Sequence, residues 1–328
     1  MSTGTSPAAG LGAWRRGRHV AWLALIPVLL LSGHAWIPDR FGHLGSLAET
    51  FLPWTGISVP LLLLFAAARR SASVAVAALV PAVLWCSIYG GTIADKRADG
   101  GDLTVVTHNV NEHNPQPHRT ARALAASGSD MVALEELGDD TAVYEAALTD
   151  RYPYHSVQGT VGLWSRYPLS DTAPVHIAPW PRALRATVHT PRGPIAVYVA
   201  HLLSVRFTPV SGFGTSLRDA AAQRLATTLR AETSPRVLVV GDFNGTTQDR
   251  GLSAVVHGLR SAQEASGAGF GFTWPASFPV ARIDHILFRG LEPRSAWTLP
   301  ATGSDHLPVA ASVQLPCCDR KGSPGPIS

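Results

Sequence analysis

The chain has 328 residues, of which 46% are hydrophobic and only 15% are charged, whereas roughly 25% of the residues in an ordinary soluble domain are charged. This composition argues against a plain cytosolic enzyme. The apolar excess and the net charge of +4 both belong to the first third: the first 99 residues carry eight Lys/Arg and four Asp/Glu, and the remainder carries nineteen of each. The C-terminal part is therefore formally neutral, which argues against a tight nucleic-acid binder.

Three apolar stretches occupy the first third, at about residues 19–37, 47–68 and 72–93. Each has about 20 residues, enough to cross a hydrocarbon core about 30 Å thick. Arginines followed by an apolar run also resemble a signal peptide, but the small-x-small site at 33–35 is weak and two more apolar stretches follow. A buried helix of a globular domain would show a polar face, and VPLLLLFAAA and ASVAVAALVPAVLW show none. We predict three transmembrane helices in the cell membrane.

Basic residues at the ends of the apolar stretches predict their orientation. Arginines at 15–18 precede the first stretch, and Arg69 and Arg70 close the second; such residues lie on the cytoplasmic side. With three spans, everything after the third is extracellular. Pro53 and Pro60 interrupt the second stretch. If that stretch did not cross the bilayer, the number of spans would be even and the C-terminal part would be cytoplasmic.

From Asp102 onward, apolar runs of strand length alternate with stretches of helical spacing at about 116–127, 139–150 and 216–232, which indicates an α/β domain. Several runs are apolar on both faces, as expected of a sheet covered on each side. The runs are LTVVTHNV, MVAL, GLWS, IAVYVAHL, RVLVVGDF, IDHILF and LPVAASVQL. The predicted organisation, in chain order, is a cytoplasmic N-terminus (1–18), three transmembrane helices (19–93), a polar linker (94–101), the α/β domain (102–315) and a disordered tail (316–328).

The three cysteines predict no disulfide framework. Cys86 lies in the third apolar stretch, and Cys317 and Cys318 are neighbours on the tail, where a bond between them would close a strained ring. We expect free or variably oxidised thiols.

Polar side chains stand at the ends of the predicted strands, where an α/β scaffold presents its site. Singly, each has an ordinary structural explanation, such as a turn former or a solvated helix start. Together they supply carboxylates and an amide for a hard divalent cation, and histidines that can donate to phosphoryl oxygens. The residues are Asn109, Glu135, Glu136, His201, Asp242, Asn244, Asp284, His285, Asp305 and His306.

The order of these motifs resembles the endonuclease/exonuclease/phosphatase superfamily, which includes DNase I-like nucleases, sphingomyelinases and inositol-polyphosphate phosphatases. The resemblance covers about residues 102–315 and implies a DNase I-like four-layer α/β sandwich, in which two packed β-sheets lie between helical layers. Glu135 stands where many relatives carry Gln, so the choice of Glu136 as the functional carboxylate depends on the register. The motifs are T-x-N-V, D-M-V-A-L-E-E, L-W-S-R-Y-P-L, A-H-L, G-D-F-N, I-D-H-I and S-D-H-L-P-V.

The resemblance also implies which residues hold the metal and the water. Asn109 and Glu136 would hold a catalytic Mg²⁺, with Mn²⁺ as the alternative, and Asp305 would complete the metal or water network. Asp242 would orient or deprotonate the attacking water, and Asn244 would hold the phosphate or that water. Such a set neutralises charge and supplies an in-line water, both of which phosphate ester cleavage requires.

Basic side chains would contact the substrate. By the same resemblance, His306, oriented by Asp284, would contact the phosphoryl oxygens. His201 would be a second phosphate contact or the acid toward the leaving oxygen, although the sequence offers it no evident acidic partner. We expect Arg182 and Arg185, in APWPRALRA, to reach phosphate in a small site.

Fold alone does not give the substrate. The membrane tether, the short linker and the balanced charge favour a lipid-linked phosphate or diphosphate over nucleic acid, which would need several Lys/Arg contacts; we expect no stable nucleic-acid partner. Three spans followed by such a domain resemble VanJ-type membrane proteins associated with teicoplanin resistance, which implies a role at the cell envelope. The alternatives are an extracellular nuclease or phosphodiesterase, and a non-catalytic module that binds antibiotic or precursor. The aromatic candidates for an apolar rim are Trp164, Trp180, Phe213, Phe270, Phe272 and Trp274.

Overall fold

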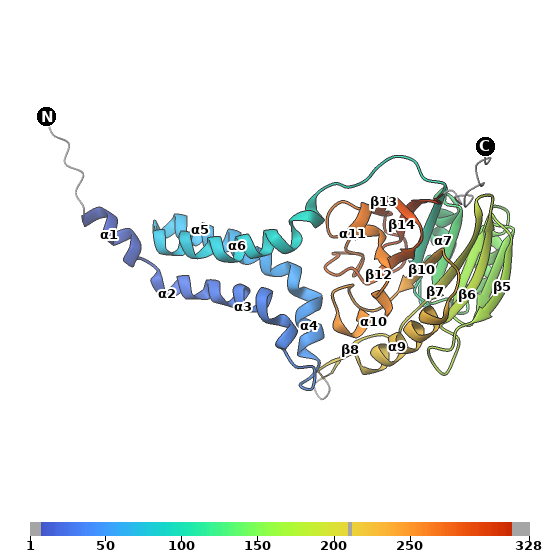
Figure 1. Ribbon diagram of the computed structural model, residues 1–328, viewed down its shortest axis with the longest axis horizontal. Helices are drawn as coiled ribbons and strands as arrows, with labels where there is room; N and C mark the ends of the chain where they lie inside the picture. The colour runs from blue at the N-terminus through green and yellow to red at the C-terminus, as the bar shows by residue number, and fades with distance from the viewer. Residues whose placement is uncertain (1–7, 209–211, 317–328) are drawn as a thin grey trace, which may run out of the picture.

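The computed structural model describes residues 8–208 and 212–316. An elongated helical segment projects from one side of an α/β domain (Figure 1). The predicted cysteine pair and the tail from residue 317 lie outside the described residues. The helical segment consists of α1 (Ala8–Arg15), α2 (Arg18–Ala21), η1 (Trp22–Ala24), α3 (Leu25–Gly33), η2 (His34–Trp36), α4 (Leu44–Phe51), η3 (Leu52–Ile57), α5 (Ser58–Arg69) and α6 (Ala72–Ile93).

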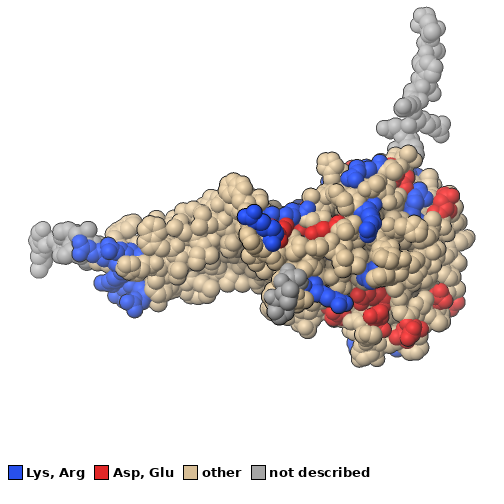
Figure 2. All heavy atoms as spheres, turned by 90° about the horizontal axis from the view of Figure 1, so that it is seen from below, with Lys and Arg blue, Asp and Glu red and all other residues tan. Residues whose placement is uncertain are grey.

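Three helical stretches are long and apolar enough to cross a membrane: Arg18–Trp36, Leu44–Arg69 and Ala72–Ile93. Pro53 lies in the 3₁₀ turn η3, so this proline changes the hydrogen-bond pattern without ending the second stretch. On the face seen in Figure 2, Lys and Arg gather at the end farthest from the α/β domain and where the segment meets that domain. The length between these ends is uncharged on this face, as contact with lipid tails requires.

The α/β domain contains two six-stranded sheets and one small two-stranded sheet. The first sheet has the order β13-β14-β1-β2-β4-β3, and the second has the order β11-β12-β10-β7-β6-β5. β1 pairs in parallel with β2, and β7 with β10. The strands are β1 (Leu103–Asn109), β2 (Met131–Glu135), β3 (Tyr154–Gln158), β4 (Val161–Ser165), β5 (Leu169–Pro174), β6 (Ala183–Thr190), β7 (Gly193–Ala200), β8 (Arg206–Thr208), β9 (Gly212–Gly214), β10 (Val237–Asp242), β11 (Arg260–Ser261), β12 (Asp284–Arg289), β13 (Glu292–Thr298) and β14 (Val309–Gln314).

Alternation along the strands gives each sheet two apolar faces. Val105 of β1 and Val240 of β10 belong to the central core between the sheets. Their neighbours face outward: Val106 packs with α7 and α8, and Val239 packs with α9 and α10. The predicted four-layer sandwich with two sheets between helical layers is confirmed. The helices of this domain are α7 (Pro117–Ala125), α8 (Thr141–Leu148), α9 (Ser216–Ala231), η4 (Arg250–Leu252), α10 (Ser253–Val256) and α11 (Ala262–Ser266).

Buried polar contacts of α4 fix the helical segment to the α/β domain. Glu49, which is 4% exposed, accepts hydrogen bonds from Nη2 of Arg250 at 2.8 Å and from its backbone N at 2.9 Å. Ser46 Oγ donates to Asp249 Oδ1 at 3.0 Å. Gly45 permits this close approach, because a Cβ there would lie 2.6 Å from Cζ of Arg250. The first two turns of the second apolar helix therefore belong to the interface with the α/β domain.

Aromatic side chains extend this interface. Trp54 of η3 donates from Nε1 to the carbonyl oxygen of Val280 at 2.7 Å and stacks on Phe272, with ring centroids 5.6 Å apart. Phe270 packs against Tyr89 of α6 at 5.7 Å. Two aromatics that we expected in the rim of the site, Phe270 and Phe272, thus pack against the helical segment.

Candidate active site

Strand ends from both sheets meet at one edge of the α/β domain. Asn109 lies opposite Glu135 at the carboxyl ends of the parallel strands β1 and β2. Asp242, the last residue of β10, faces Asp284, the first residue of the antiparallel β12. Asn109 Nδ2 donates to Asp242 Oδ2 at 2.9 Å and so joins the two sheets. The strand order therefore gathers polar side chains that are far apart in the chain.

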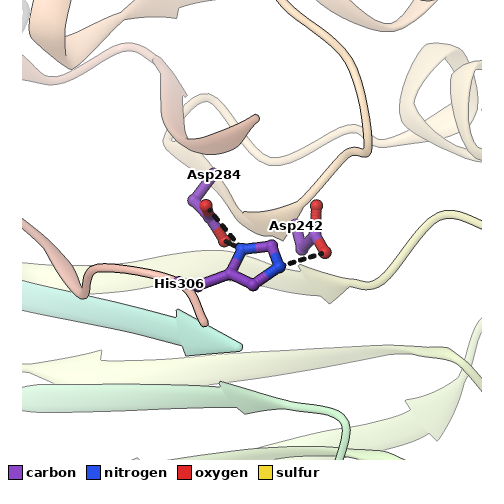
Figure 3. Close-up of side chains that lie close together, drawn as sticks. All are labelled: Asp242, Asp284 and His306. Atoms are coloured by element: carbon purple, nitrogen blue, oxygen red, sulfur yellow. Dashed lines mark hydrogen bonds and ion pairs between the residues drawn. The ribbon is translucent and has the colours of Figure 1, made fainter. Parts of the chain in front are cut away.

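His306 lies between two carboxylates (Figure 3). Its Nδ1 is 2.9 Å from Asp284 Oδ2, and its Nε2 is 3.9 Å from Asp242 Oδ2. Burial lowers the pKa of His306, but the charges of Asp284 and Asp242 outweigh this effect and raise the pKa to about 10. Burial raises the pKa of Asp284, but the charge and hydrogen bond of His306 lower it below its ordinary value. His306 and Asp284 are therefore an imidazolium–carboxylate pair at neutral pH.

Asp242 is held by three hydrogen bonds. Its Oδ1 accepts from the backbone N of Asn244 at 2.8 Å, and its Oδ2 accepts from Asn109 Nδ2 at 2.9 Å and from Asn244 Nδ2 at 3.2 Å. Asn244 has φ 49°, a left-handed conformation that Asn adopts more readily than most residues. Burial raises the pKa of Asp242 to about 7, so this carboxylate can take up a proton near neutral pH.

The two consecutive glutamates have different surroundings. Glu135 is fully buried; its Oε1 accepts from Thr107 Oγ1 at 2.8 Å, and its Oε2 has no hydrogen-bond partner among the described residues. Burial raises the pKa of Glu135 well above its ordinary value. Glu136 has φ 55°, and its partly exposed carboxylate lies 3.4 Å from Nε2 of the buried His201. Glu136, the carboxylate chosen by register, is the one that reaches open space.

This difference predicts opposite results for two matched substitutions. Glu136→Gln removes a charge from the open site, and we expect the Mg²⁺ concentration that gives half-maximal activity to rise by roughly tenfold or more. Glu135→Gln keeps the size of the buried side chain and an acceptor oxygen for Thr107 Oγ1, so activity should stay near that of the wild type. Activity measured over a Mg²⁺ titration checks both. The reverse pattern would assign the metal to Glu135.

Asp305 is held at the rim by Asn111 and Trp274. Its Oδ1 accepts from Asn111 Nδ2 at 2.7 Å, and its Oδ2 accepts from Trp274 Nε1 at 3.3 Å. Asn111 has φ 60°, and its backbone N donates to Asn109 Oδ1 at 3.0 Å. Asn111 is not among the residues predicted from the sequence. An Asn two residues after an Asn that ends a strand is typical of an Asx turn, and this pattern could have identified Asn111.

His201 lies behind the site, and its role as a second phosphate contact or as the acid toward the leaving oxygen stays a prediction. It is fully buried, and Arg182 donates from Nε to its carbonyl oxygen at 3.1 Å, with Nη2 of Arg182 2.7 Å from the ring Nε2. Burial, together with the charges of Arg182 and His306, lowers the pKa of His201 well below its ordinary value. A neutral imidazole keeps one ring N–H, and Nε2 of His201 lies 3.4 Å from Glu136 Oε1 and 2.7 Å from Arg182 Nη2, so His201 is placed to orient these two neighbours.

Arg185 also departs from its expected place as a substrate contact. It lies on β6 opposite Tyr198, whose side chain belongs to the outer layer packed on α9. Arg185 Nε donates to Glu232 Oε2 at 2.8 Å, and its Nη1 donates to Thr187 Oγ1 at 2.9 Å. The alternation of side chains along β6 therefore turns Arg185 to the helix-covered face, where it forms a structural ion pair.

The Glu232 ion pair predicts a pH-dependent stability. Burial raises the pKa of Glu232, but hydrogen bonds from Arg185, from the backbone of Ser234 and from the hydroxyl of Tyr198 lower it to about 2. The folded pKa lies below the unfolded one, so the carboxylate stabilises the fold above the ordinary Glu range, and this contribution is lost as the pH falls toward 2. We expect Glu232→Gln to lower the free energy of unfolding at pH 7 by roughly 2–3 kcal/mol. Denaturant unfolding at several pH values should show the difference from wild type shrinking below pH 5; a constant difference would contradict the assignment.

A cavity of about 270 Å³ opens beside these side chains; we call it the acidic cavity. Two of its lining residues, Thr50 and Phe51, are the last residues of α4. The helical segment therefore forms one wall of the site. Of the expected rim, Phe213 and Trp274 line this cavity, whereas Trp164 is fully buried in the core. The lining of the acidic cavity includes Thr50, Phe51, Glu136, Ser204, Val205, Phe213, Asp242, Asn244, Gly245, Trp274, Ala281, Ile283, Asp305 and His306.

The donor set formed by the lining of the acidic cavity and by the buried Asn109 and Asp284 behind it fits a divalent metal ion. Asp242, Asp284 and His306 each offer a ligand atom within 4.8 Å of the others, although Asp284 and His306 are paired with each other. Glu136 and Asp242 are carboxylates whose pKa burial raises, so holding both ionised in one cavity is unfavourable without a compensating charge. Carboxylate and amide oxygens, here with Asn109, are the ligands of hard cations.

Comparison with known proteins agrees with this fold. The sequence profile described as the Endonuclease/Exonuclease/phosphatase family matches residues 106–306. No curated protein matches the sequence. An endonuclease/exonuclease/phosphatase from Bacteroides vulgatus has a similar structure, with a TM-score of 0.54 and 17% identity over 66% of this chain and 100% of that one.

Two further solved structures share the fold. Sphingomyelinase C from Streptomyces griseocarneus has a TM-score of 0.50 and 20% identity over 64% of this chain and 98% of its own. The beta toxin of Staphylococcus aureus has a TM-score of 0.52 and 14% identity over 64% and 99% of the two chains. Because the family profile spans more than half of the sequence, this chain belongs to the Endonuclease/Exonuclease/phosphatase family.

Proposed function

We propose that this protein is a membrane-tethered, metal-dependent phosphohydrolase that acts on a lipid-linked phosphate or diphosphate of the cell envelope. Members of its family are metal-dependent phosphoester hydrolases. The observation that carries the proposal is the lining of the acidic cavity. Asp242 and His306 line this cavity together with Thr50 and Phe51, which belong to a helical stretch apolar enough to cross a membrane.

In this proposal Asp242 takes the proton of the attacking water. Asn109 and Asn244 hold its carboxylate in place through three hydrogen bonds. Its pKa of about 7, raised by burial, lies near the operating pH, where a general base is most effective. The fixed carboxylate also orients the water toward the phosphorus.

His306 stabilises the phosphoryl group. As an imidazolium, it donates from Nε2 to a phosphoryl oxygen, while Nδ1 donates to Asp284. Asp284 thereby fixes the ring orientation and keeps the imidazole protonated. A cation held in advance at the place where negative charge develops is an effective catalytic group.

Glu136 and Asn109 would hold the metal ion, and Asp305 would complete the water network beside them. We propose Mg²⁺, with Mn²⁺ as the alternative. When bound, the ion would supply charge neutralisation at the phosphoryl group. Asn111 and Trp274 keep the Asp305 carboxylate facing this position.

The apolar wall supports a lipid substrate. Phe51, Phe213 and Trp274 line the acidic cavity together with the catalytic side chains. An amphipathic substrate would place its phosphate among the polar residues and its first methylene groups against these aromatic rings. Phe51 is continuous with the apolar helix that follows it, so the rest of the chain would extend along this helix into the bilayer.

The positions of the arginines support an extracellular catalytic domain. Ser73 Oγ donates to the carbonyl oxygen of Arg16 at 3.1 Å. The basic residues before the first span therefore lie beside the turn that carries Arg69 and Arg70. Such residues stay in the cytoplasm, and the α/β domain lies at the opposite end of the segment (Figure 1).

Reporter fusions test this orientation. Alkaline phosphatase fused after the C-terminus should be active, and a fluorescent protein at the same place should be dark, because the first folds in the periplasm or outside and the second folds in the cytoplasm. An inactive phosphatase with a fluorescent partner would place the catalytic domain in the cytoplasm and remove the outer-leaflet lipid as its substrate.

The activity itself is tested with the detergent-solubilised full chain and three substrates: a lipid diphosphate, DNA and sphingomyelin, each with and without EDTA. We expect the lipid diphosphate to be hydrolysed fastest and EDTA to abolish turnover. Faster cleavage of DNA would favour the extracellular nuclease. No turnover of any substrate with Mg²⁺ would favour a non-catalytic binding module.

We infer that the activity contributes to resistance to teicoplanin-type glycopeptides, as the resemblance of the whole architecture to such resistance proteins suggests. Expression of the wild type in a susceptible host should raise the inhibitory concentration of teicoplanin, and Asp242→Ala should not. Equal protection by the wild type and by Asp242→Ala would show that resistance does not depend on hydrolysis.

A further inference from the structure

A second cavity adjoins the acidic cavity. It has a volume of about 510 Å³, and Ser204 lines both cavities. We call it the basic cavity. Its lining includes His43, Trp180, Arg182, Ser204, Arg206 and Ser216.

The two cavities have opposite charge. The acidic cavity is lined by three carboxylates, Glu136, Asp242 and Asp305. Two arginines, Arg182 and Arg206, line the basic cavity, and none of its lining residues is Asp or Glu. Over residues 8–208 and 212–316, no carboxylate forms an ion pair with either arginine. A metal-binding site thus lies next to a site suited to an anion.

The nearest acidic residue at the start of α9 does not neutralise the basic cavity. Asp219 Oδ1 accepts from Arg218 Nε at 2.8 Å, and its Oδ2 accepts from Thr215 Oγ1 at 2.7 Å. Its carboxylate is therefore engaged by residues outside the lining. The charges of Glu136, Asp242 and Glu112 attract Arg182, although none of these carboxylates forms an ion pair with it in the described residues.

Two side chains of the basic cavity, Arg182 and His43, are held by polar contacts, and Arg206 is exposed. Arg182 is held by the backbone and ring of His201. His43, which precedes α4, has ring nitrogens 2.9 Å from Thr215 Oγ1 and 3.1 Å from Ser216 Oγ. The residue that precedes α4 thus lines the basic cavity, and the last two residues of α4 line the acidic one.

We propose that the basic cavity binds a second phosphoryl group, so that the substrate is a lipid diphosphate rather than a lipid monophosphate. This inference rests on the proposed function and narrows it. The lipid-proximal phosphoryl lies in the acidic cavity beside Phe51, and the terminal phosphoryl contacts Arg182 and Arg206. Guanidinium groups match phosphate oxygens in geometry and keep their charge at all physiological pH values.

The arrangement defines the bond that breaks. Water gives a proton to Asp242, and its oxygen bonds to the lipid-proximal phosphorus. The bond from that phosphorus to the bridging oxygen breaks, and the bridging oxygen leaves with the terminal phosphate, which takes up the released proton. The products are a lipid monophosphate and orthophosphate, and the arginines stabilise the negative charge of the leaving group.

A binding experiment tests the basic cavity without turnover. Calorimetric titration of the full chain in detergent and EDTA should show inorganic pyrophosphate binding about tenfold or more tightly than orthophosphate, because it can reach both arginines. Arg206→Ala should remove this difference, and Arg230→Ala, which changes an exposed arginine on the far end of α9, should not. Equal binding of the two anions by wild type, or an unchanged difference in Arg206→Ala, would overturn the inference.

Turnover tests the substrate class. Wild type should hydrolyse farnesyl diphosphate with a higher kcat/KM than farnesyl phosphate, and Arg206→Ala should lower the value for the diphosphate about tenfold more than for the monophosphate. In ¹⁸O-labelled water, the label should enter farnesyl phosphate and not orthophosphate. Label in orthophosphate, or faster hydrolysis of inorganic pyrophosphate than of the lipid, would overturn the arrangement. If neither lipid is hydrolysed, the proposed function fails, while the titration still decides whether the basic cavity binds an anion.

Discussion

His306→Ala should lower kcat for a lipid phosphate by about 10²-fold or more, which corresponds to about 2.7 kcal/mol of transition-state stabilisation. The ring lies between Asp284 and Asp242 and carries a positive charge at neutral pH. In the proposed mechanism, removing the ring takes away the Nε2 donor to the phosphoryl group in the acidic cavity. Asp242→Ala should cause a loss of similar or greater size, because it removes the carboxylate that activates water. Initial rates with purified full-length variants measure both effects.

A matched control separates this loss from misfolding. His118→Ala changes an exposed histidine on α7, and we expect its kcat and thermal unfolding to match the wild type. Circular dichroism should show that His306→Ala keeps the native secondary structure. Full turnover in both His306→Ala and Asp242→Ala would refute the catalytic assignment of this site.

Arg250→Ala should lower the free energy of unfolding by about 3 kcal/mol, because it leaves the buried Glu49 carboxylate without its counter-charge. Nη2 and Nε of Arg250 donate to Glu49 at 2.8 and 3.1 Å. Nη1 donates to the carbonyl oxygen of Ile37 at 2.8 Å, and Nη2 donates to that of His34 at 2.9 Å. These contacts tie two parts of the helical segment to η4, which follows Asp242 and Asn244 in the chain.

A double-mutant cycle isolates this contribution. Glu49→Gln and the double variant Glu49→Gln/Arg250→Ala complete the cycle, and Arg119→Ala, at an exposed position on α7, is the control. Denaturant unfolding in detergent, followed by tryptophan fluorescence, should show a coupling energy well above that of surface pairs, which are worth about 1 kcal/mol or less. If the losses of unfolding free energy in Glu49→Gln and Arg250→Ala were additive, this would contradict a stabilising ion pair between α4 and the α/β domain.

The central part of the fold follows from local sequence patterns. The seven apolar runs predicted as strands are β1, β2, β4, β7, β10, β12 and β14, and the three helical stretches are α7, α8 and α9. β2 and β10, for example, are buried at every position, because sheets and helices cover both of their faces. Composition alone identifies such strands.

The sequences of the edge strands do not contain a continuous apolar run that would predict a strand. β3, β5 and β13 are at the edges of their sheets and are partly exposed. Their sequences mix polar and apolar residues, since one side of each strand has no partner strand and water reaches several side chains. β6 is interior to its sheet, but Arg185 and Thr187 interrupt its apolar pattern on the outer face. Its pairings with β5 and β7 show that this segment is a strand.

The sequence by itself determined the α/β class, the three apolar helices and the strand-end residues from which the candidate site is built, because periodicity and motif order are local properties of the chain. The tertiary structure decided which side chains reach the cavities. It turned Arg185 to the outer face, buried His201, and brought Thr50 and Phe51 of α4 beside Asp242. The pair that fixes α4 in this place, Glu49 and Arg250, is separated by 201 positions. No local pattern encodes such a contact, since it depends on how two independently formed elements pack.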